Sequence, residues 1–135
     1  MFELDPRLAA DTFEVLSWPL CRVLLMNDSR YPWLILVPAR TGVVELTDLD
    51  ADDRLQLMRE SMAATEYLKG RFNADKMNVA SLGNVVAQLH VHHVARFHHD
   101  DAWPAPVWGR GAAVRYDQLE CSELLKSLRE GLPAL

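Results

Sequence analysis

The chain has 135 residues, which is enough for one domain with a substantial core. Half of the residues are hydrophobic and 24% are charged, which is ordinary for a soluble globular protein. The net charge of −5 argues against binding to nucleic acid or to an anionic membrane, because both attract basic surfaces.

Neither a transmembrane segment nor a signal peptide is expected. No stretch is apolar over the length of a membrane span, and residues 1–5 lack the pattern of a signal peptide. Cys21 and Cys121 are far apart and show no zinc-binding spacing, so free thiols in a reducing compartment are the default. We therefore expect a cytoplasmic protein that forms a single domain over residues 1–135 and uses no cofactor.

The beginning of the chain predicts a helix followed by a hairpin. Asp5 before Pro6 is typical of an N-cap with proline at the first helical position. Two apolar runs separated by a short polar turn predict paired antiparallel strands. The elements expected here are a helix over 6–16 and strands over 21–26 and 33–37.

The rest of the chain predicts a long helix, two further strands and a terminal helix. Acidic residues at 50–53 suit a helix start, and apolar residues follow at helical spacing until Gly70 offers a C-cap. Asp117 with Glu120 resembles a capping box. The elements expected here are a helix over 51–69, strands over 72–80 and 88–96, and a helix over 117–130.

The stretch from Gln88 to Arg96 carries the candidate chemistry. Read as a strand, it places Gln88, His90 and His92 on one face, roughly 6.6 Å apart, and His93 on the other. A half-exposed strand of an ordinary sheet is the plain alternative. Two same-face histidines and an amide make that alternative less attractive, because they lower the β-propensity of the strand.

Such a row suits attack on phosphorus. Neutral imidazole is a good nucleophile, and a neighbouring imidazole or amide can donate hydrogen bonds to phosphoryl oxygens. Phosphoryl transfer needs mainly positioning and charge stabilisation, so a short row of donors can suffice. His90, the middle member, is the expected nucleophile, with His92 and Gln88 as donors.

The same stretch resembles the signature of the histidine triad (HIT) superfamily, His-φ-His-φ-His-φ-φ, where φ is apolar. His90 and His92 match its middle and last histidines, while Gln88 stands at the first. The signature is often followed by Pro-Arg, of which this chain keeps Arg96. The resemblance covers residues 16–97 and is nearest to the fragile histidine triad branch, which includes dinucleoside polyphosphate hydrolases.

The resemblance also implies contacts with a substrate. Asn27 stands where the polyphosphate hydrolases have an asparagine near the ribose. Asn78 and Asn84 match an asparagine strand and a loop that precede the triad, and Trp33 replaces the histidine of a Pro-Gly-His element. The residues expected to bind substrate are Asn27, Asn78, Asn84, Arg96 and Trp33.

For the whole molecule, the resemblance implies an α+β fold with a bent antiparallel sheet of about five strands and a long flanking helix. The core would span 16–97, followed by a tail and helix over 98–135. The implied activity is that of a nucleotide hydrolase or transferase. It would cleave at the α-phosphorus of a dinucleoside polyphosphate or nucleoside phosphoramidate, through a nucleotidyl-histidine intermediate.

The resemblance further implies a homodimer. Four tryptophans, three of them near segments without an obvious core partner, also suggest surface that a second copy would cover. Trp103 and Trp108 could instead stack on a base or cover the sheet, and core or dimer packing is the simpler expectation.

Two other functions stay open. The departures from the family pattern at Gln88, Trp33 and Val85 are compatible with a nucleotide-binding sensor or adaptor without useful turnover. A metal-binding protein that uses the histidines between His90 and His99 is the second alternative. The row lacks the convergent ligands of a metal site, so we expect no metal.

Overall fold

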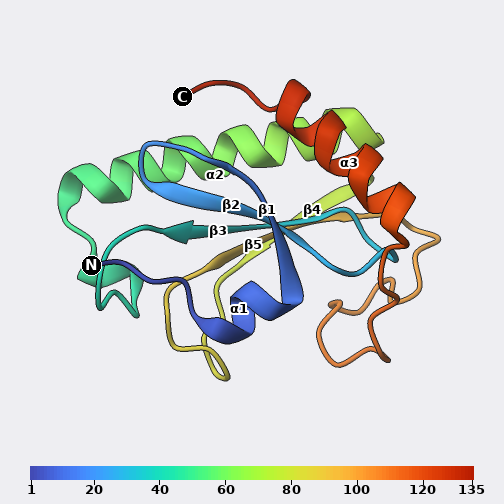
Figure 1. Cartoon of the computed structure of the whole chain (residues 1–135). Coiled ribbons are helices and arrows are strands. Elements are labelled where there is room, and N and C mark those ends of the chain that lie inside the picture. Colours follow the sequence, from blue (N-terminus) through green and yellow to red (C-terminus); the bar gives the residue numbers. More distant parts are fainter.

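The computed structural model describes residues 1–135 and contains one five-stranded antiparallel sheet (Figure 1). Its strands lie in the order β1-β2-β3-β5-β4. The elements follow one another as α1 (Pro6–Asp11), β1 (Thr12–Ser17), β2 (Cys21–Met26), β3 (Trp33–Pro38), the 3-10 turn η1 (Leu46–Asp48), α2 (Ala51–Phe72), β4 (Lys76–Ala80), β5 (Val91–Arg96) and α3 (Gln118–Gly131). The predicted α+β fold, with an antiparallel sheet of five strands and a long helix, is confirmed.

The predicted helix over 6–16 is wrong in its second half. α1 ends at Asp11, and the chain enters β1 directly at Thr12, where it pairs with β2. β-branched and aromatic residues are frequent in this half and favour a strand. Pairing with β2 also buries Val15 in the core, whereas an isolated helix at the surface would leave much of its apolar surface exposed.

α2 runs past its predicted end at residue 69. Gly70 lies inside the helix, and Asn73 closes it in the left-handed conformation, with φ 52° and ψ 50°. Asparagine adopts this backbone more readily than most residues, because its short polar side chain can hydrogen-bond locally. As a result, β4 begins at Lys76 rather than at 72. β5 is also shorter than predicted and begins at Val91 rather than at 88.

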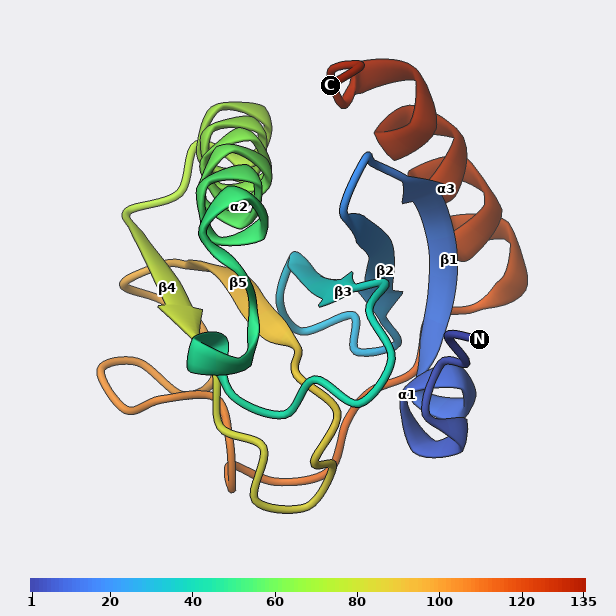
Figure 2. The same ribbon diagram turned by 90° about the vertical axis from the view of Figure 1, so that its left-hand side faces the viewer.

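α2 covers one face of the sheet over β3, β4 and β5, while α3 packs beside β1 (Figure 2). Between the sheet and these helices lies the larger core cluster, which includes Leu34, Leu36 and Val91 of the strands and Ala64 and Leu68 of α2. Full burial of one such large apolar side chain stabilises the fold by about 1.5–3 kcal/mol. None of the helices is both long enough and apolar enough to cross a membrane.

A buried carboxylate ties α2 to the start of β2. Glu60 is fully buried, and its two oxygens accept hydrogen bonds from the backbone N–H groups of Leu20 and Cys21 at 2.9 and 2.8 Å. Gln56 Nε2 donates a third hydrogen bond at 2.7 Å. These three donors offset the desolvation of the carboxylate, so Glu60 can fix the position of α2 against the sheet.

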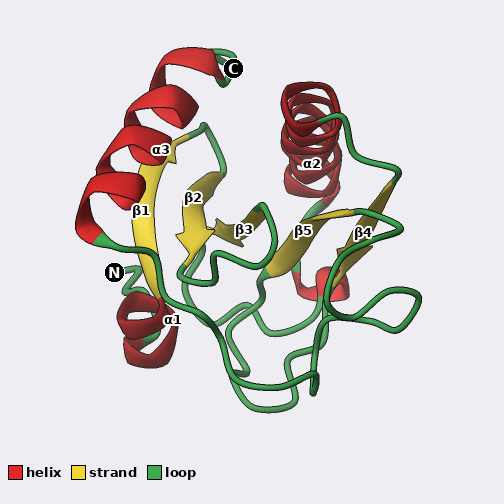
Figure 3. Cartoon of the chain, turned by 90° about the vertical axis from the view of Figure 1, so that its right-hand side faces the viewer, coloured by secondary structure: helices red, strands yellow, loops and turns green.

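The other face of the sheet carries a smaller core cluster. Trp33, Ile35 and Val94 belong to it together with Leu8 of α1 and Val107. Val107 lies in residues 97–117, here called the C-terminal arm, which runs as loops under the sheet from β5 to α3 (Figure 3). α1 and the C-terminal arm therefore supply the cover on this face that α2 supplies on the opposite one.

Candidate functional site

The face covered by α1 and the C-terminal arm contains a cavity of about 380 Å³. His90 and His92 form part of its wall, together with Trp33 of β3. Trp108 of the C-terminal arm and Asn84 of the loop before β5 also line it. Of the residues expected to act or to bind substrate, the structure therefore brings together His90, His92, Trp33 and Asn84.

The predicted alternation of side chains along β5 is confirmed. His92 lines the cavity, whereas its neighbour His93 points to α2, where its Nε2 lies 2.7 Å from Ser61 Oγ. His93 is fully buried, and this burial lowers its pKa to about 4. His93 is therefore a neutral residue between the sheet and α2, and it does not reach the cavity.

The surroundings of His90 fix which ring nitrogen carries the proton. Its Nδ1 lies 2.7 Å from the backbone carbonyl oxygen of Gln88. A carbonyl only accepts hydrogen bonds, so Nδ1 carries the proton in the neutral ring. Nε2 then keeps its lone pair, which an attacking imidazole requires.

His92 is held in the opposite tautomer. The indole Nε1–H of Trp33 donates to His92 Nδ1 over 3.0 Å, so the neutral His92 ring carries its proton on Nε2. Burial, together with charge repulsion from His90 and His93, lowers the pKa of His92 to about 3. With ring centroids 5.0 Å apart, His90 offers a lone pair and His92 offers a donor at one site.

Gln88 does not line the cavity. Its Oε1 accepts a hydrogen bond from the backbone N–H of Asp5, and its Nε2 donates to the carbonyl oxygen of Glu3, both at 2.8 Å. The carboxamide thus binds the N-terminal segment as a neighbouring strand would. The first triad position therefore holds the N-terminus in place, and the structure does not bring its side chain to the two histidines.

Asn27 is also engaged elsewhere. Its Oδ1 accepts a hydrogen bond from the backbone N–H of Tyr116 at 3.0 Å. Next to it, the buried Asp28 receives the Arg30 guanidinium and the N–H of Val114. This polar turn after β2 anchors the end of the C-terminal arm, and Asn27 is not among the residues that line the cavity.

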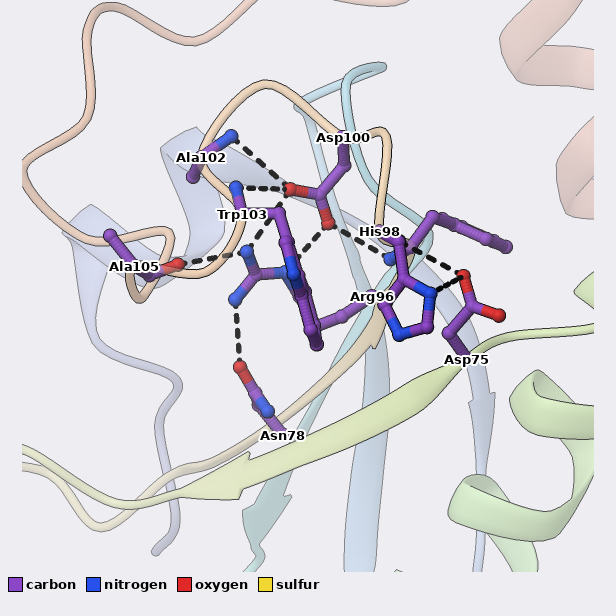
Figure 4. A network of polar contacts seen from close by, with 9 residues as sticks. Asp75, Asn78, Arg96, His98, Asp100, Ala102, Trp103 and Ala105 are labelled. Carbon is purple, nitrogen blue, oxygen red and sulfur yellow. Dashed lines mark hydrogen bonds and ion pairs between the residues drawn. The ribbon is translucent and has the colours of Figure 1, made fainter.

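Arg96 and Asn78 form part of a second anchor of the same arm (Figure 4). The Arg96 guanidinium is almost fully buried and donates to both carboxylate oxygens of Asp100, at 2.8 and 3.1 Å. It also donates to Asn78 Oδ1 and to the carbonyl of Ala105, each at 2.8 Å. With its donors used in this way, Arg96 holds the arm against β4 and β5 and does not reach the cavity.

The cavity wall also contains residues outside the set expected to act or to bind substrate. Trp108 lies with its ring centroid 5.1 Å from that of His92, and α1 contributes Arg7, Leu8 and Asp11. Trp108 follows β5 by a long loop, and α1 precedes the histidines by some eighty positions of sequence. Only the proline-aromatic composition around Trp108 singled that segment out, and no signal marked α1.

The histidines do not form a metal centre in this structure. No group of three or more His, Cys, Asp or Glu side chains lies in an arrangement that could hold a metal ion. His98 and His99 are exposed, and His98 packs against Trp103 with ring centroids 4.8 Å apart. Cys21 and Cys121 are buried and free. The structure therefore contains no set of ligands for the metal-binding alternative.

Comparison with known proteins agrees with this geometry. A histidine triad protein from Bradyrhizobium japonicum superposes with a TM-score of 0.94 at 42% identity, covering 98% of each chain. One from Marinobacter aquaeolei VT8 gives a TM-score of 0.95 at 45% identity, covering 98% of this chain and 96% of that one. No curated protein matches the sequence.

A more distant likeness concerns the fold alone. A diadenosine triphosphate hydrolase from Plasmodium falciparum superposes with a TM-score of 0.60 at 15% identity, covering 96% of this chain and 79% of that one. At the level of sequence, the model of the HIT domain matches residues 7–99, which include the whole sheet and both cavity histidines. The chain therefore belongs to the HIT domain family.

Proposed function

We propose that the protein is a nucleotide hydrolase or transferase that acts at the α-phosphorus of a nucleotide conjugate. The observation that carries this proposal is the pair of complementary tautomers at the cavity. His90 has an unprotonated Nε2 because its Nδ1–H is used by Gln88 O, and His92 has a protonated Nε2 because Trp33 donates to its Nδ1. A nucleophile and a donor then stand side by side without any charged group having to be buried.

The proposed reaction proceeds in two displacements. His90 Nε2 attacks the α-phosphorus, an N–P bond forms, and the bond from phosphorus to the leaving group breaks with its electron pair going to that group. His92 Nε2–H donates to a phosphoryl oxygen, where charge accumulates. An amine leaving group takes up a proton from solvent as it departs. A water molecule then attacks the phosphorus, the N–P bond breaks with its electron pair returning to His90, and the water proton is released to solvent.

Membership in the HIT family supports this activity class, and a diadenosine triphosphate hydrolase shares the fold. Trp33 and Asn84 line the same cavity as the two histidines, and we propose that they contact the bound nucleotide. The cavity wall also includes the apolar Leu8, Met26 and Ile35, which suit the flat apolar surface of a base.

Phosphorus NMR in ¹⁸O-labelled water tests the proposal. The protein is incubated with a dinucleoside triphosphate and, separately, with a nucleoside phosphoramidate. We expect a nucleoside monophosphate that carries one ¹⁸O, because water attacks only the α-phosphorus. His90→Ala should abolish turnover and keep nucleotide binding within about tenfold. His98→Ala, which removes an exposed histidine outside the cavity, is the matched control and should keep the parental rate.

Binding without turnover is the second candidate, and one observation favours it. Gln88 binds the N-terminal segment, so only two imidazoles of the row reach the cavity. A protein that binds the conjugates and releases no monophosphate over many hours would be a nucleotide sensor or adaptor. A protein that neither binds nor cleaves any nucleotide conjugate would contradict both functions.

We also propose a homodimer, for a reason other than the tryptophans considered in the sequence analysis. Trp18 and Trp33 are buried within the chain, and Trp103 and Trp108 are half-buried, so the tryptophans do not supply an uncovered surface. Four of the exposed apolar side chains lie instead on α2 and on β4, which is an edge strand of the sheet. They are Leu55, Met58 and Met62 of α2 and Val79 of β4. A second copy would cover this surface and the open strand edge.

A further inference from the structure

We infer that Arg7 of α1 binds the anionic leaving group of the substrate and thereby makes the protein selective for polyphosphate conjugates over phosphoramidates. This inference rests on the proposed function and goes beyond it, because the two histidines alone do not distinguish the two classes of conjugate. It assigns a role in specificity to an element that lies outside the histidine stretch.

Arg7 is the one residue with a permanent positive charge among those that line the cavity. Its guanidinium makes no hydrogen bond or ion pair within the chain, and Arg7 contacts Asp5 only through its backbone N–H. By contrast, Arg30, Arg40 and Arg96 each bind a carboxylate. Arg7 therefore has its full set of five donors available for a ligand.

The backbone at Arg7 is held from two sides, while its side chain is exposed. Asp5 caps α1 through the Arg7 N–H, and the Asp5 backbone N–H is held by Gln88 Oε1. Leu8, the next residue, is buried in the core beneath the cavity. Gln88, which replaces the first histidine of the triad, thus acts as a positioning residue that links the histidine strand to the helix carrying Arg7.

The electrostatics of the cavity favour a cation as the contact for a highly charged substrate. The chain has a net charge of −5, and His92 is neutral at physiological pH because its pKa is lowered to about 3. Asp11, one turn further along α1, also lines the cavity and repels an anion. A leaving group of two or more phosphates therefore finds its compensating charge at Arg7, whereas an amine leaving group needs none.

The test compares two substrates in matched variants. Arg7→Gln should lower kcat/KM for a dinucleoside triphosphate by about fivefold, which is the order expected for one charged contact of an exposed side chain. The same variant should change kcat/KM for a nucleoside phosphoramidate by less than about twofold. Arg59→Gln removes the same charge from an exposed position on α2 and should leave both values unchanged. Gln88→Ala should shift the ratio of the two values in the same direction as Arg7→Gln.

A binding measurement separates this inference from the proposed function. Inorganic tripolyphosphate is titrated into each variant, and the fluorescence of the cavity tryptophans reports binding. We expect weaker binding in Arg7→Gln and tighter binding in Asp11→Asn. If the parental protein cleaves neither conjugate while Arg7→Gln still weakens tripolyphosphate binding, the proposed function fails and the anion site stands. Equal losses on both conjugates, or unchanged tripolyphosphate binding in Arg7→Gln, would overturn the inference.

Discussion

The indole N–H of Trp33 donates a hydrogen bond to Nδ1 of His92 across 3.0 Å, between two neighbouring strands of the sheet. Trp33 stands where the resemblance leads one to expect a histidine. An indole N–H is a donor only, so it holds His92 in a single tautomer with the proton on Nε2. Trp33 therefore supplies a hydrogen bond to His92 without adding a group that could itself take up a proton.

Trp33→Phe tests this relationship. The variant keeps an aromatic ring in the core and removes the donor, so His92 can move its proton to Nδ1 and lose its role as donor. A lost hydrogen bond of about 1 kcal/mol corresponds to a decrease in kcat of roughly fivefold. Trp18→Phe is the matched control, because that indole N–H donates to Pro133 O and lies away from the cavity. Equal kcat in the parent and Trp33→Phe would show that Trp33 is only a packing residue.

The two buried imidazoles predict that the protein loses stability in mild acid. The pKa values of His92 and His93 are lowered by burial from the ordinary 6.5 to about 3 and about 4. The unfolded chain therefore takes up protons before the folded one as the pH falls. The stabilisation of the folded state that comes from keeping these imidazoles neutral is complete above pH 6.5. Below pH 6.5 the free energy of unfolding decreases by at most about 1.4 kcal/mol per pH unit for each imidazole.

Urea unfolding at several values between pH 7 and pH 4 measures this slope. His93→Gln removes one of the two imidazoles, so the free energy of unfolding should depend less steeply on pH. This holds whether or not the substitution changes stability at pH 7. His98→Gln alters an exposed histidine and should leave the slope unchanged. A free energy of unfolding that is flat between pH 6.5 and pH 5 in the parental protein contradicts the assignment of two neutral, buried histidines.

Glu60 should be among the most sensitive positions outside the cavity. Three N–H donors point at the two carboxylate oxygens of Glu60. Glu60→Gln replaces one of these oxygens by an NH₂ group, so at least one hydrogen bond is replaced by a repulsion between two donors in a buried site. We expect the free energy of unfolding to fall by about 3 kcal/mol. Glu66→Gln, on the exposed side of the same helix, should change it by less than about 0.5 kcal/mol. Equal effects of the two substitutions in thermal unfolding would contradict the role given to Glu60.

Light scattering tests the proposed dimer. We expect twice the mass of the 15.3 kDa chain at micromolar concentration. Met58 is 59% exposed in the single chain and lies in the apolar surface of α2, so Met58→Glu should weaken association while leaving the fold intact. Lys69→Glu, at the end of the same helix, serves as a control for added negative charge. A parental protein of 15.3 kDa would contradict the dimer.

The strands of the sheet were predictable because their pattern is local. Apolar runs flanked by turn residues mark β2 and β3, and the alternation along β5 correctly separates His92 from His93. β1 was missed because its stability comes from pairing with β2, a partner that the helix-capping signal at Asp5 does not reveal. The start of α1 is determined by local sequence, and its end is determined by the pairing of β1 with β2.

The polar residues of the site were less predictable than the histidines. Asn27 and Arg96 carry the right chemistry at the right places in the sequence, and both are used to hold the C-terminal arm. Their partners, Tyr116 and Asp100, lie in a segment without a periodic pattern. The sequence therefore does not show that the side chains of Asn27 and Arg96 are already hydrogen-bonded within the chain. The same holds for Gln88, whose partners Glu3 and Asp5 lie more than eighty residues away.

The most direct test of the central claim is the stereochemical course of the reaction at the α-phosphorus. A dinucleoside triphosphate with a chiral α-phosphorothioate is hydrolysed in ¹⁸O-labelled water, and the configuration of the resulting nucleoside phosphorothioate is determined. Each in-line displacement inverts phosphorus, so a reaction through nucleotidyl-His90 inverts it twice and gives overall retention. Overall inversion would mean a single direct attack by water, and would contradict His90 as the nucleophile.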